Sequence, residues 1–507
     1  MSVSATWTTL VQIAVVGTQR DGVQLPTAPS DFDTIGNTAP QTTEDMVLRL
    51  AGMLGVARRA GASAFEDAAT PIPAASADTL PRCNAAAARD LVHVLANDIE
   101  LLPEWLLLAN ATKQRIPEAL LPAVFERARG RKEFRDAITV AAGARGRWLA
   151  QQNPEWQAFA GAADDAEHQW RTGTGAARVT AFVAMRARDA AEARQLLERS
   201  WDEQSASERA EFVTAMRAHV SDEDEPFLES LLDDRSKAVR ERAATVLAYL
   251  PNSRFAARAR RLVERLVSVR SGIFGTKLDV VLPEEADDAM RRDGIEVAGD
   301  ASRTDSSIGG PRALLLRRIV ERVPPPHLSQ TLAPRRFLDL AADAEHGPAI
   351  ISGAMQAAVT YGDDEWRAAC IDFLCERQDF MRWATPAGLV GETPQPQRDV
   401  LLRGMQRGRG TALAFLHHVP APWDPALSAA AADLMRALFA TAADDTEWAR
   451  RRLLLLEASR RLDVGVPGRA QGWPEPFGVE RTRDAPNLFG VTIDFRAAMS
   501  AHLKAER

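Results

Sequence analysis

Apolar residues recur at every third or fourth position along most of the chain. Such spacing places them on one side of a helix. The segments with this pattern are 43–60, 85–97, 117–128, 349–359, 365–377, 427–441 and 447–462. The alternation of apolar and polar residues that is typical of strands is almost absent. The chain is therefore predicted to be almost wholly α-helical.

The clearest organisation lies between residues 224 and 269, where three apolar faces are separated by short polar turns. Pro251 and Asn252 end the second helix, and Ser253 can cap a third. The faces consist of Phe227, Leu228, Leu231 and Leu232; of Val239, Ala243, Val246, Leu247 and Leu250; and of Phe255, Ala259, Leu262, Val263 and Leu266. Helices joined so closely pack antiparallel, and none can bury its face alone, so neighbouring pairs must stack.

From Leu228 to Leu250 the order L-x-x-L-L-D-D-x-x-x-x-V-R-x-x-A-A-x-x-L-x-x-L resembles the HEAT repeat. This resemblance implies that a turn aspartate, Asp233 or Asp234, and Arg240 form a polar ladder between repeats. The expected fold is all-α, a HEAT-like α-solenoid of antiparallel helix pairs with a small β-containing insertion.

That insertion is expected at 271–311, where the helical pattern stops. Residues 277–282 alternate as a short strand, and 294–310 are rich in Gly, Ser and Asp, which indicates a β-containing or flexible segment. The predicted divisions are an N-terminal helical region at 1–140, HEAT-like helical repeats at 141–270, the β/loop insertion at 271–311 and a C-terminal helical region at 312–507.

Length and composition narrow the class of protein. A chain of 507 residues exceeds the size at which one hydrophobic core keeps growing, which favours several domains or an elongated stack. The net charge of -7 disfavours a surface made as a whole for nucleic acid or anionic membrane. Three cysteines suit a reducing compartment, and no apolar run is long enough to cross a bilayer. We expect a cytoplasmic protein.

Motifs for nucleotide binding and acid–base catalysis are weak. The run 173–175, Gly-Thr-Gly, lacks the lysine and the preceding strand of a phosphate-binding loop. The acidic run 222–225 and the pair 444–445 precede apolar segments, and acids there complement helix N-termini without any catalytic role. No catalytic residue and no enzymatic activity are predicted.

Metal-binding patterns are equally weak. Cys370 and Cys375 are five positions apart on an expected helix and point to different faces, so packing is the better interpretation. The neighbours His417 and His418 diverge by about 100° on a regular helix and cannot readily share a metal. We therefore predict no metal and no cofactor.

Two segments are candidate partner-binding sites. The first, 145–156, brings together Arg145, Arg147, Trp148, Asn153 and Trp156. Aromatic residues and arginine dominate the energetics of binding surfaces, which makes this block a candidate contact patch. The alternative interpretation is a helix end whose two tryptophans pack into the core while Asn153 and Pro154 form a turn.

The second candidate is the basic segment 235–270. Its basic residues are Arg235, Lys237, Arg240, Arg242, Arg254, Arg258, Arg260, Arg261, Arg265 and Arg270. Against these ten stand only Glu241 and Glu264, a local excess of 10 − 2 = +8 in an acidic chain. The segment is either a solvated helix face with ion pairs between repeats or a concave basic surface for an acidic protein or nucleic acid. The candidate residues here are Arg235, Arg240, Arg258 and Arg261.

Four segments together resemble an uncharacterised bacterial family of HEAT-like proteins, a domain of unknown function. They are 7–20, 145–156, 225–250 and 310–320, and the similarity extends over most of the chain. Members of that family are often encoded beside a SWIM zinc-finger protein, a MoxR-type AAA+ ATPase and a von Willebrand factor A protein. The resemblance implies a helical scaffold or adaptor in a MoxR-type chaperone system, and it supplies no catalytic residues.

The sequence thus supports two functions. The first is a non-catalytic scaffold or adaptor that binds partner proteins on a helical-repeat surface, since each repeat extends such a surface without needing a new core. The expected partner is a MoxR-type AAA+ ATPase or a von Willebrand factor A protein. The alternative is nucleic-acid binding through a basic concave HEAT-like face.

Overall fold

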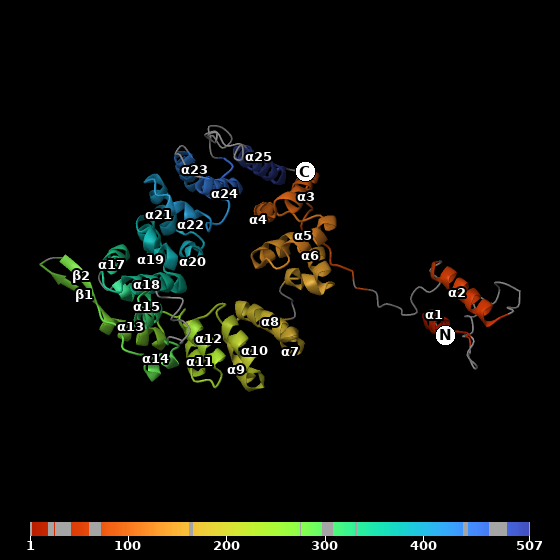
Figure 1. Cartoon of the computed structure of the whole chain (residues 1–507), viewed down its shortest axis with the longest axis horizontal. Coiled ribbons are helices and arrows are strands. Elements are labelled where there is room, and N and C mark those ends of the chain that lie inside the picture. Colours follow the sequence, from red (N-terminus) through yellow and green to blue (C-terminus); the bar gives the residue numbers. More distant parts are fainter. Residues whose placement is uncertain are drawn as a thin grey trace. The chain divides into compact units, whose positions relative to one another are not determined.

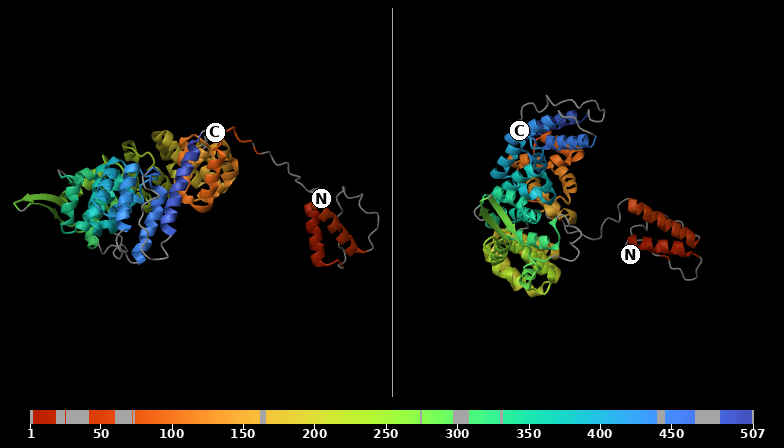
Figure 2. Two further views of the ribbon diagram at one scale, coloured as in Figure 1. Left: turned by 90° about the horizontal axis from the view of Figure 1, so that it is seen from above. Right: turned by 60° about the vertical axis from the view of Figure 1, so that its left-hand side comes forward.

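The computed structural model describes residues 3–18, 25, 42–59, 72, 74–161, 166–273, 275–296, 308–329, 332–439, 445–465 and 484–505. The chain forms two compact units, Met1–Ala75 and Ser76–Arg507 (Figures 1 and 2). Helices packed in pairs make up most of both units, with one small antiparallel hairpin in the second. The expected fold class, an all-α HEAT-like solenoid of antiparallel helix pairs with a small β-containing insertion, is confirmed.

The first unit is a pair of helices, α1 (Val3–Val16) and α2 (Thr43–Arg59). The second helix begins where the apolar periodicity predicts. Its buried positions are Val47, Leu50 and Leu54, which pack with Leu10 of α1. Met46 is exposed, because the face that meets α1 is centred on Leu50 and Leu54.

The second unit contains the remaining elements. Its first part comprises α3 (Ala85–Asn97), η2 (Ile99–Leu101), α4 (Leu102–Ala111), η3 (Glu118–Leu120), α5 (Leu121–Ala128), η4 (Lys132–Phe134), α6 (Arg135–Gln151) and η5 (Pro154–Phe159). Its middle part comprises α7 (Ala166–Thr172), α8 (Gly175–Arg188), α9 (Ala190–Arg199), η6 (Trp201–Glu203), α10 (Ala206–Ala215), η7 (Asp222–Asp224), α11 (Glu225–Leu231), α12 (Lys237–Leu247) and α13 (Arg254–Leu266).

A hairpin follows, formed by β1 (Val267–Gly272) and β2 (Gly275–Val280). The last part comprises α14 (Asp288–Arg292), α15 (Pro311–Val320), α16 (Pro325–Ser329), α17 (Pro334–Ala342), α18 (Gly347–Tyr361), α19 (Asp364–Glu376), η10 (Gln378–Trp383), α20 (Pro386–Val390), α21 (Gln395–Gln406), α22 (Thr411–Leu416), α23 (Pro425–Phe439), α24 (Asp445–Arg461) and α25 (Asp484–Lys504). No helix in the described part of the chain is long and apolar enough to cross a membrane.

Helices α10 to α13 form the repeat that the sequence indicates. Ser205 and Glu208 make the expected capping box at the start of α10, and Ser253 accepts the amide hydrogen of Ala256 at the start of α13. Leu231 of α11 and Val246 of α12 are buried in one cluster with residues of α8 and α10. Each apolar face is covered by neighbouring helices, as stacking requires.

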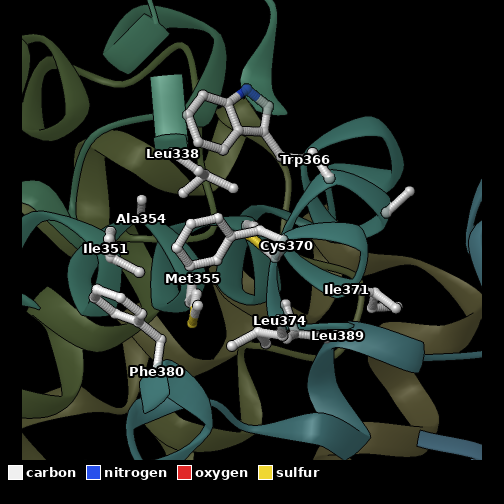
Figure 3. Packing of buried hydrophobic residues seen from close by; sticks show 14 of the residues in the cluster. Leu338, Ile351, Ala354, Met355, Trp366, Cys370, Ile371, Leu374, Phe380 and Leu389 are labelled. Carbon is white, nitrogen blue, oxygen red and sulfur yellow. The ribbon is translucent and has the colours of Figure 1, made fainter. Parts of the chain in front are cut away.

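The largest hydrophobic cluster extends from α13 and the hairpin to α25, and most of its residues lie on helices α15 to α24 (Figure 3). Trp366 and Cys370 on α19 face Leu338 of α17 and Met355 of α18 across this core. Helix α19 therefore packs on both sides, toward α17 and α18 and toward α21. Its buried residues, which include Trp366, Cys370, Ile371, Phe373 and Leu374, therefore cover more than one side of the helix.

The hairpin corrects one sequence expectation. Residues 267–270 were assigned to the helical repeats, but β1 begins at Val267 directly after α13. The expected strand at 277–282 is confirmed for residues 277–280 as part of β2, which begins earlier, at Gly275, with Leu278 buried and Lys277 exposed. Beyond Glu296, the expected flexible part of the insertion lies outside the described residues up to Ile308.

The C-terminal helix α25 joins the end of the second unit to its beginning. It packs against α24 and also against α3 and α4. At the centre, Arg496 is fully buried and its Nε and Nη2 donate to the Glu104 carboxylate of α4 at 2.5 and 2.9 Å. Arg496 Nη1 also donates to the Ser459 and Leu462 carbonyls at the end of α24. One guanidinium therefore fastens three helices.

We predict that Glu104→Ala releases α25, because it leaves the guanidinium of Arg496 buried without its counter-charge. Loss of one partner from a buried pair costs about 3–5 kcal/mol. Hydrogen exchange of the α25 amides should rise accordingly. Glu100→Ala is the matched control, since the Glu100–Arg131 pair is solvent-exposed and worth at most about 1 kcal/mol. Equal protection of α25 in both variants would show that the Glu104–Arg496 pair does not hold α25 in place.

Candidate functional site

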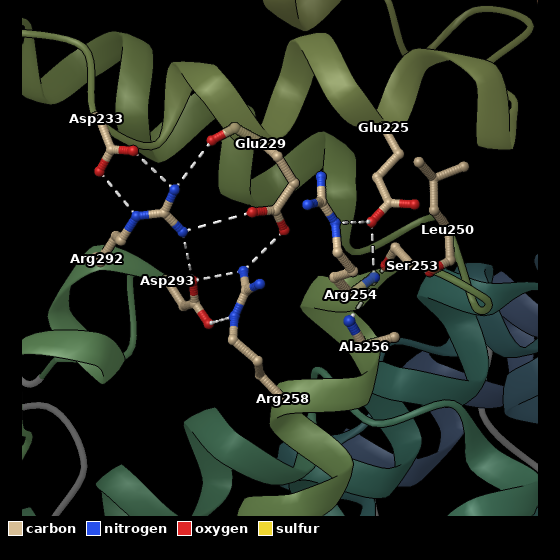
Figure 4. A network of polar contacts seen from close by, with 10 residues as sticks. All are labelled: Glu225, Glu229, Asp233, Leu250, Ser253, Arg254, Ala256, Arg258, Arg292 and Asp293. Carbon is tan, nitrogen blue, oxygen red and sulfur yellow. Dashed lines mark hydrogen bonds and ion pairs between the residues drawn. The ribbon is translucent and has the colours of Figure 1, made fainter.

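Acidic side chains from outside the basic segment bind its arginines (Figure 4). Arg258 on α13 donates to Asp293, which follows α14, with Nε–Oδ2 and Nη2–Oδ1 distances of 2.7 and 2.8 Å. Its Nη2 also lies 2.8 Å from Glu229 Oε1 on α11. Arg254 bonds Glu225 of α11 through both its backbone and its side chain. These pairs tie successive helices of the stack together.

Arg292 at the end of α14 completes the network. It donates to both carboxylate oxygens of Asp233, in the turn after α11, at 2.7 and 2.8 Å. Its hydrogen bonds lower the pKa of Asp233 and raise that of Arg292 itself. Desolvation lowers the pKa of Arg258, but the hydrogen bonds that it donates to Asp293 and Glu229 outweigh desolvation, so its pKa is raised. These pKa shifts hold Asp233, Arg292 and Arg258 in their charged forms.

The polar ladder implied by the HEAT resemblance takes a different form. Arg240 donates to the backbone carbonyls of Asp234 and Arg235, within its own turn. The Asp234 carboxylate instead caps the amide of Ser236 and lies 3.4 Å from Arg209 of α10. Arg240 therefore stabilises its own turn. The turn aspartates Asp233 and Asp234 pair with Arg292 and Arg209 instead.

Four arginines of the basic segment remain exposed, and two of them, Arg235 and Arg261, are candidate residues. Within the described residues, no ion pair involves Arg235, Arg242, Arg261 or Arg265. Two of them, Arg261 and Arg265, lie one turn apart on α13 and line a surface cavity of about 570 Å³. Leu262 and Met290 contribute apolar surface to the same cavity, and Asp287 and Asp293 contribute carboxylates. The cavity is therefore of mixed charge rather than purely basic.

In the block 145–156, Arg145, Asn153 and Trp156 make contacts within the chain. Gly143, at φ +68°, interrupts α6, and the chain restarts its helix with the Arg145 amide bonded to Asp78. The Arg145 guanidinium lies 2.8 Å from Glu118. Desolvation raises the pKa of Glu118, but its hydrogen bonds, including those from Arg115, bring it down to about 2.

The second half of the block ends the helix. Asn153 accepts the amide hydrogen of Glu155 and so begins η5, which confirms the expected turn. Trp156 is partly buried against Phe125, and its indole N–H donates to Glu126 at 2.8 Å. Arg147 and Trp148 are also partly buried. This block and the basic segment pack against different hydrophobic clusters, so the structure does not unite them in one site.

The structure describes Cys370, Cys375, His417 and His418, which the sequence singled out. Cys370 and Cys375 are free thiols; burial raises the pKa of both, that of Cys375 to about 12. Desolvation lowers the pKa of His418, whose ring packs edge-on to that of His417. Among the described residues, no group of three or more His, Cys, Asp or Glu side chains could hold a metal ion.

Sequence reasoning missed one exposed feature, the tip of the hairpin. Ile273 is 99% exposed, although it is a large aliphatic residue. It follows Gly272, which pairs with Gly275 across the hairpin. The signal for this tip is the run Gly-Ile-Phe-Gly at 272–275, in which two glycines bracket two apolar residues.

A model of DUF5691, a family of unknown function, matches residues 9–503. The chain belongs to this family. The DUF5691 match contains nearly all of the four segments on which the sequence resemblance rested, so the expected membership of a family of unknown function is confirmed. No curated protein and no solved structure matches the chain.

We predict different effects for two neighbouring arginines of α13. Arg258→Ala removes hydrogen bonds to two buried carboxylates and should lower the free energy of unfolding by about 1.5–3 kcal/mol. Arg261→Ala, one turn away on the exposed side, should change it by less than about 0.5 kcal/mol. Thermal unfolding of both variants tests this. Equal midpoints would show that the Glu229–Arg258–Asp293 contacts contribute no net stability.

Proposed function

We propose that this chain is a non-catalytic scaffold or adaptor that binds partner proteins, in a system built around a MoxR-type AAA+ ATPase and a von Willebrand factor A protein. The observation that carries the proposal is the hairpin, which extends from the helices with Ile273 fully exposed at its tip (Figures 1 and 2). An apolar side chain that projects from the surface can fill a pocket of a partner protein and so anchor the contact.

The base of the hairpin is firmly held. Val267 of β1 and Leu278 of β2 are buried in the largest cluster, and β2 packs against α17. The amide of Val281 donates to the Leu266 carbonyl, which extends the pairing to the end of α13. The helical stack therefore presents the tip at a defined place, which lowers the entropy lost on binding.

Local turn chemistry does not explain the tip. Gly272 and Gly275 enclose a two-residue connection, and such connections favour Asn-Gly or Asp-Gly. Here the sequence has Ile273 and Phe274, of which the structure describes Ile273. Positions that break a local rule are expected at functional sites. An apolar residue in this place is best explained by a pocket on another molecule.

Charge around the tip narrows the chemistry of the partner. Arg270 and Lys277 stand directly opposite each other on the two strands, and both are exposed. Like charges in facing positions destabilise a strand pair. Asp279 offsets Arg270 at 2.5 Å. The two basic side chains, Arg270 and Lys277, favour a partner whose apolar pocket is bordered by carboxylates.

The hairpin edges favour a protein over a lipid surface. Each outer edge of this two-stranded sheet carries backbone groups without a neighbouring strand in the sheet. A strand of a partner protein can pair with such an edge, whereas hydrocarbon cannot. The identity of the partner, a MoxR-type AAA+ ATPase or a von Willebrand factor A protein, rests on the family resemblance described from the sequence.

We predict that the full-length chain retains a MoxR-type ATPase or a von Willebrand factor A protein from its own organism at low salt, and that Ile273→Asp reduces recovery at least about tenfold. Val140→Asp is the matched control, because Val140 is an exposed aliphatic residue on α6. Recovery of neither protein by the wild-type chain would contradict the proposal. Equal recovery by Ile273→Asp and Val140→Asp would show that the hairpin does not bind the partner.

Nucleic-acid binding is the second candidate, favoured by the exposed pair Arg261 and Arg265 beside the α13 cavity. The ion pairs of Arg254 and Arg258 reduce the charge excess that suggested it. The candidate surface is therefore limited to a few cations, which predicts weak binding with a shallow dependence on salt.

Duplex DNA tests this second candidate. If it holds, the full chain shifts the duplex at low salt, and Arg261→Glu with Arg265→Glu abolishes the shift. Arg261→Lys with Arg265→Lys should retain it, because charge rather than geometry governs phosphate attraction. Absence of a shift, or a shift unaffected by the Glu substitutions, would exclude this surface.

A further inference from the structure

The backbone pairing of the hairpin determines which of its N–H and C=O groups point outward. In an antiparallel pair, facing residues alternate between those that bond each other through the backbone and those whose backbone groups point away from the partner strand. The Val281 amide donates to the Leu266 carbonyl at 2.8 Å, so these two residues form a bonded pair. Val267 and Val280, the next facing pair, therefore point their backbone groups outward.

Two further pairs of residues follow the same alternation. Val269 faces Leu278, and Ser271 faces Thr276. Both pairs lie an even number of positions along the strands from Val267, so their N–H and C=O groups also lie on the two outer edges. No third strand adjoins these edges in the part of the chain that the structure describes. Each outward residue presents one donor and one acceptor, and an extended peptide can match both at the same spacing.

The edge of β1 is more open than the edge of β2. Ser271 on β1 is exposed, whereas Thr276, which faces it on β2, is half-buried. Val269 is half-buried, whereas Leu278, which faces it, is buried. The two strands differ because β2 packs against α17, while β1 continues directly from the end of α13. An added strand therefore has its best access along β1.

The two faces of the hairpin define the side chains that an added strand needs. Val267 is buried in the largest hydrophobic cluster, and Val269 packs against that cluster. Because side chains alternate along a strand, Arg270 projects from the opposite face, where its side chain is 76% exposed. A neighbouring strand continues both faces, so it needs an apolar residue beside Val269 and a polar residue beside Arg270.

Exposed arginines at the base of β1 favour acidic residues at one end of the added strand. Arg265 lies two residues before Val267, and Arg261 and Arg265 both line the α13 cavity. Neither arginine forms an ion pair with any residue that the structure describes. A strand that continues past the base of β1 toward α13 would bring carboxylates to these cations. Nucleic acid has the required charge, but its backbone has no N–H groups to pair with the edge carbonyls.

We propose that an extended segment of the partner protein joins the hairpin as a third strand along β1. Apolar and polar residues alternate in this segment, and acidic residues lie at the end nearest α13. The inference rests on the proposed function, because it concerns the partner that the hairpin binds. Backbone hydrogen bonds to Val269 and Ser271 supply affinity along the strand, and Ile273 anchors the contact at the tip.

Proline substitutions at two facing positions test this inference in the full-length chain. The N–H groups of Ser271 and Thr276 both point outward, so proline at either position removes no hydrogen bond between β1 and β2. Ser271→Pro should raise the dissociation constant for the purified MoxR-type ATPase or von Willebrand factor A protein at least about tenfold, because the edge loses a donor and the ring blocks the added strand. Thr276→Pro, on the other edge, is the matched control and should leave the dissociation constant unchanged.

Hydrogen exchange of the complex is a second measurement, which needs no substitution. The amides of Val269 and Ser271 should exchange more slowly in the complex, whereas those of Thr276 and Leu278 should not change. Equal binding by wild type and Ser271→Pro, equal weakening by both proline variants, or no slowing at Val269 and Ser271 would overturn the third strand and leave the proposed function standing. Binding that is lost after nuclease treatment would overturn it too. If the wild-type chain binds neither protein, the proposed function and this inference both fail.

Discussion

The apolar stripe of each amphipathic helix in this chain can be buried only by the helices on either side of it. In the repeat from α10 to α13, Leu231 and Val246 lie in one cluster because three helices close around them. No single helix pair could achieve this, since a pair covers one side of each helix and leaves the other in water. Each helix pair is therefore stabilised by its contacts with the neighbouring pairs in the stack.

Buried ion pairs join the helices in addition to apolar packing. Arg186 and Asp224 are both fully buried and 2.8 Å apart, and they join α8 to the start of α11. Arg258 and Arg292 join α11, α13 and α14, and Arg496 joins α25 to α4 and α24. Buried charges are costly unless paired. Each pair therefore penalises any arrangement in which its helices are displaced, and this favours one register of the stack.

This use of charge also changes how the basic segment is interpreted. A local excess of positive charge in sequence marks a binding surface only if the cations lack acidic neighbours in space. Here Glu225, Glu229, Asp279 and Asp293 supply much of the missing charge. Among the described residues of the segment, Arg235, Arg242, Arg261 and Arg265 remain outside ion pairs and are available to a partner.

The sequence predicts helices well where local signals agree. Residues 85–97 form α3 with the expected bounds, because Asn84 caps a clear apolar stripe. Strand β1 was missed because Val267 and Val269 continue the spacing of the α13 stripe, and only their pairing with β2 distinguishes strand from helix. That pairing is a tertiary effect, which periodicity does not contain.

The candidate sites were less predictable for a related reason. The arginines of the basic segment could be read from the sequence, but their partners could not. Asp293 is 35 positions from Arg258, and Asp233 is 59 positions from Arg292. Such contacts depend on how the helices stack. The family resemblance added membership of DUF5691 and an expectation about partners, and it could not identify the residues that bind them.

Hydrogen exchange of the full chain carrying Leu231→Asp tests the central claim most directly. The account predicts that protection falls in α11 and also in its neighbours α10 and α12, while α19 and α21, which belong to a different cluster, keep theirs. Loss confined to α11 would show that the helices hold their places independently. That result would contradict a stack in which every helix is buried by the next.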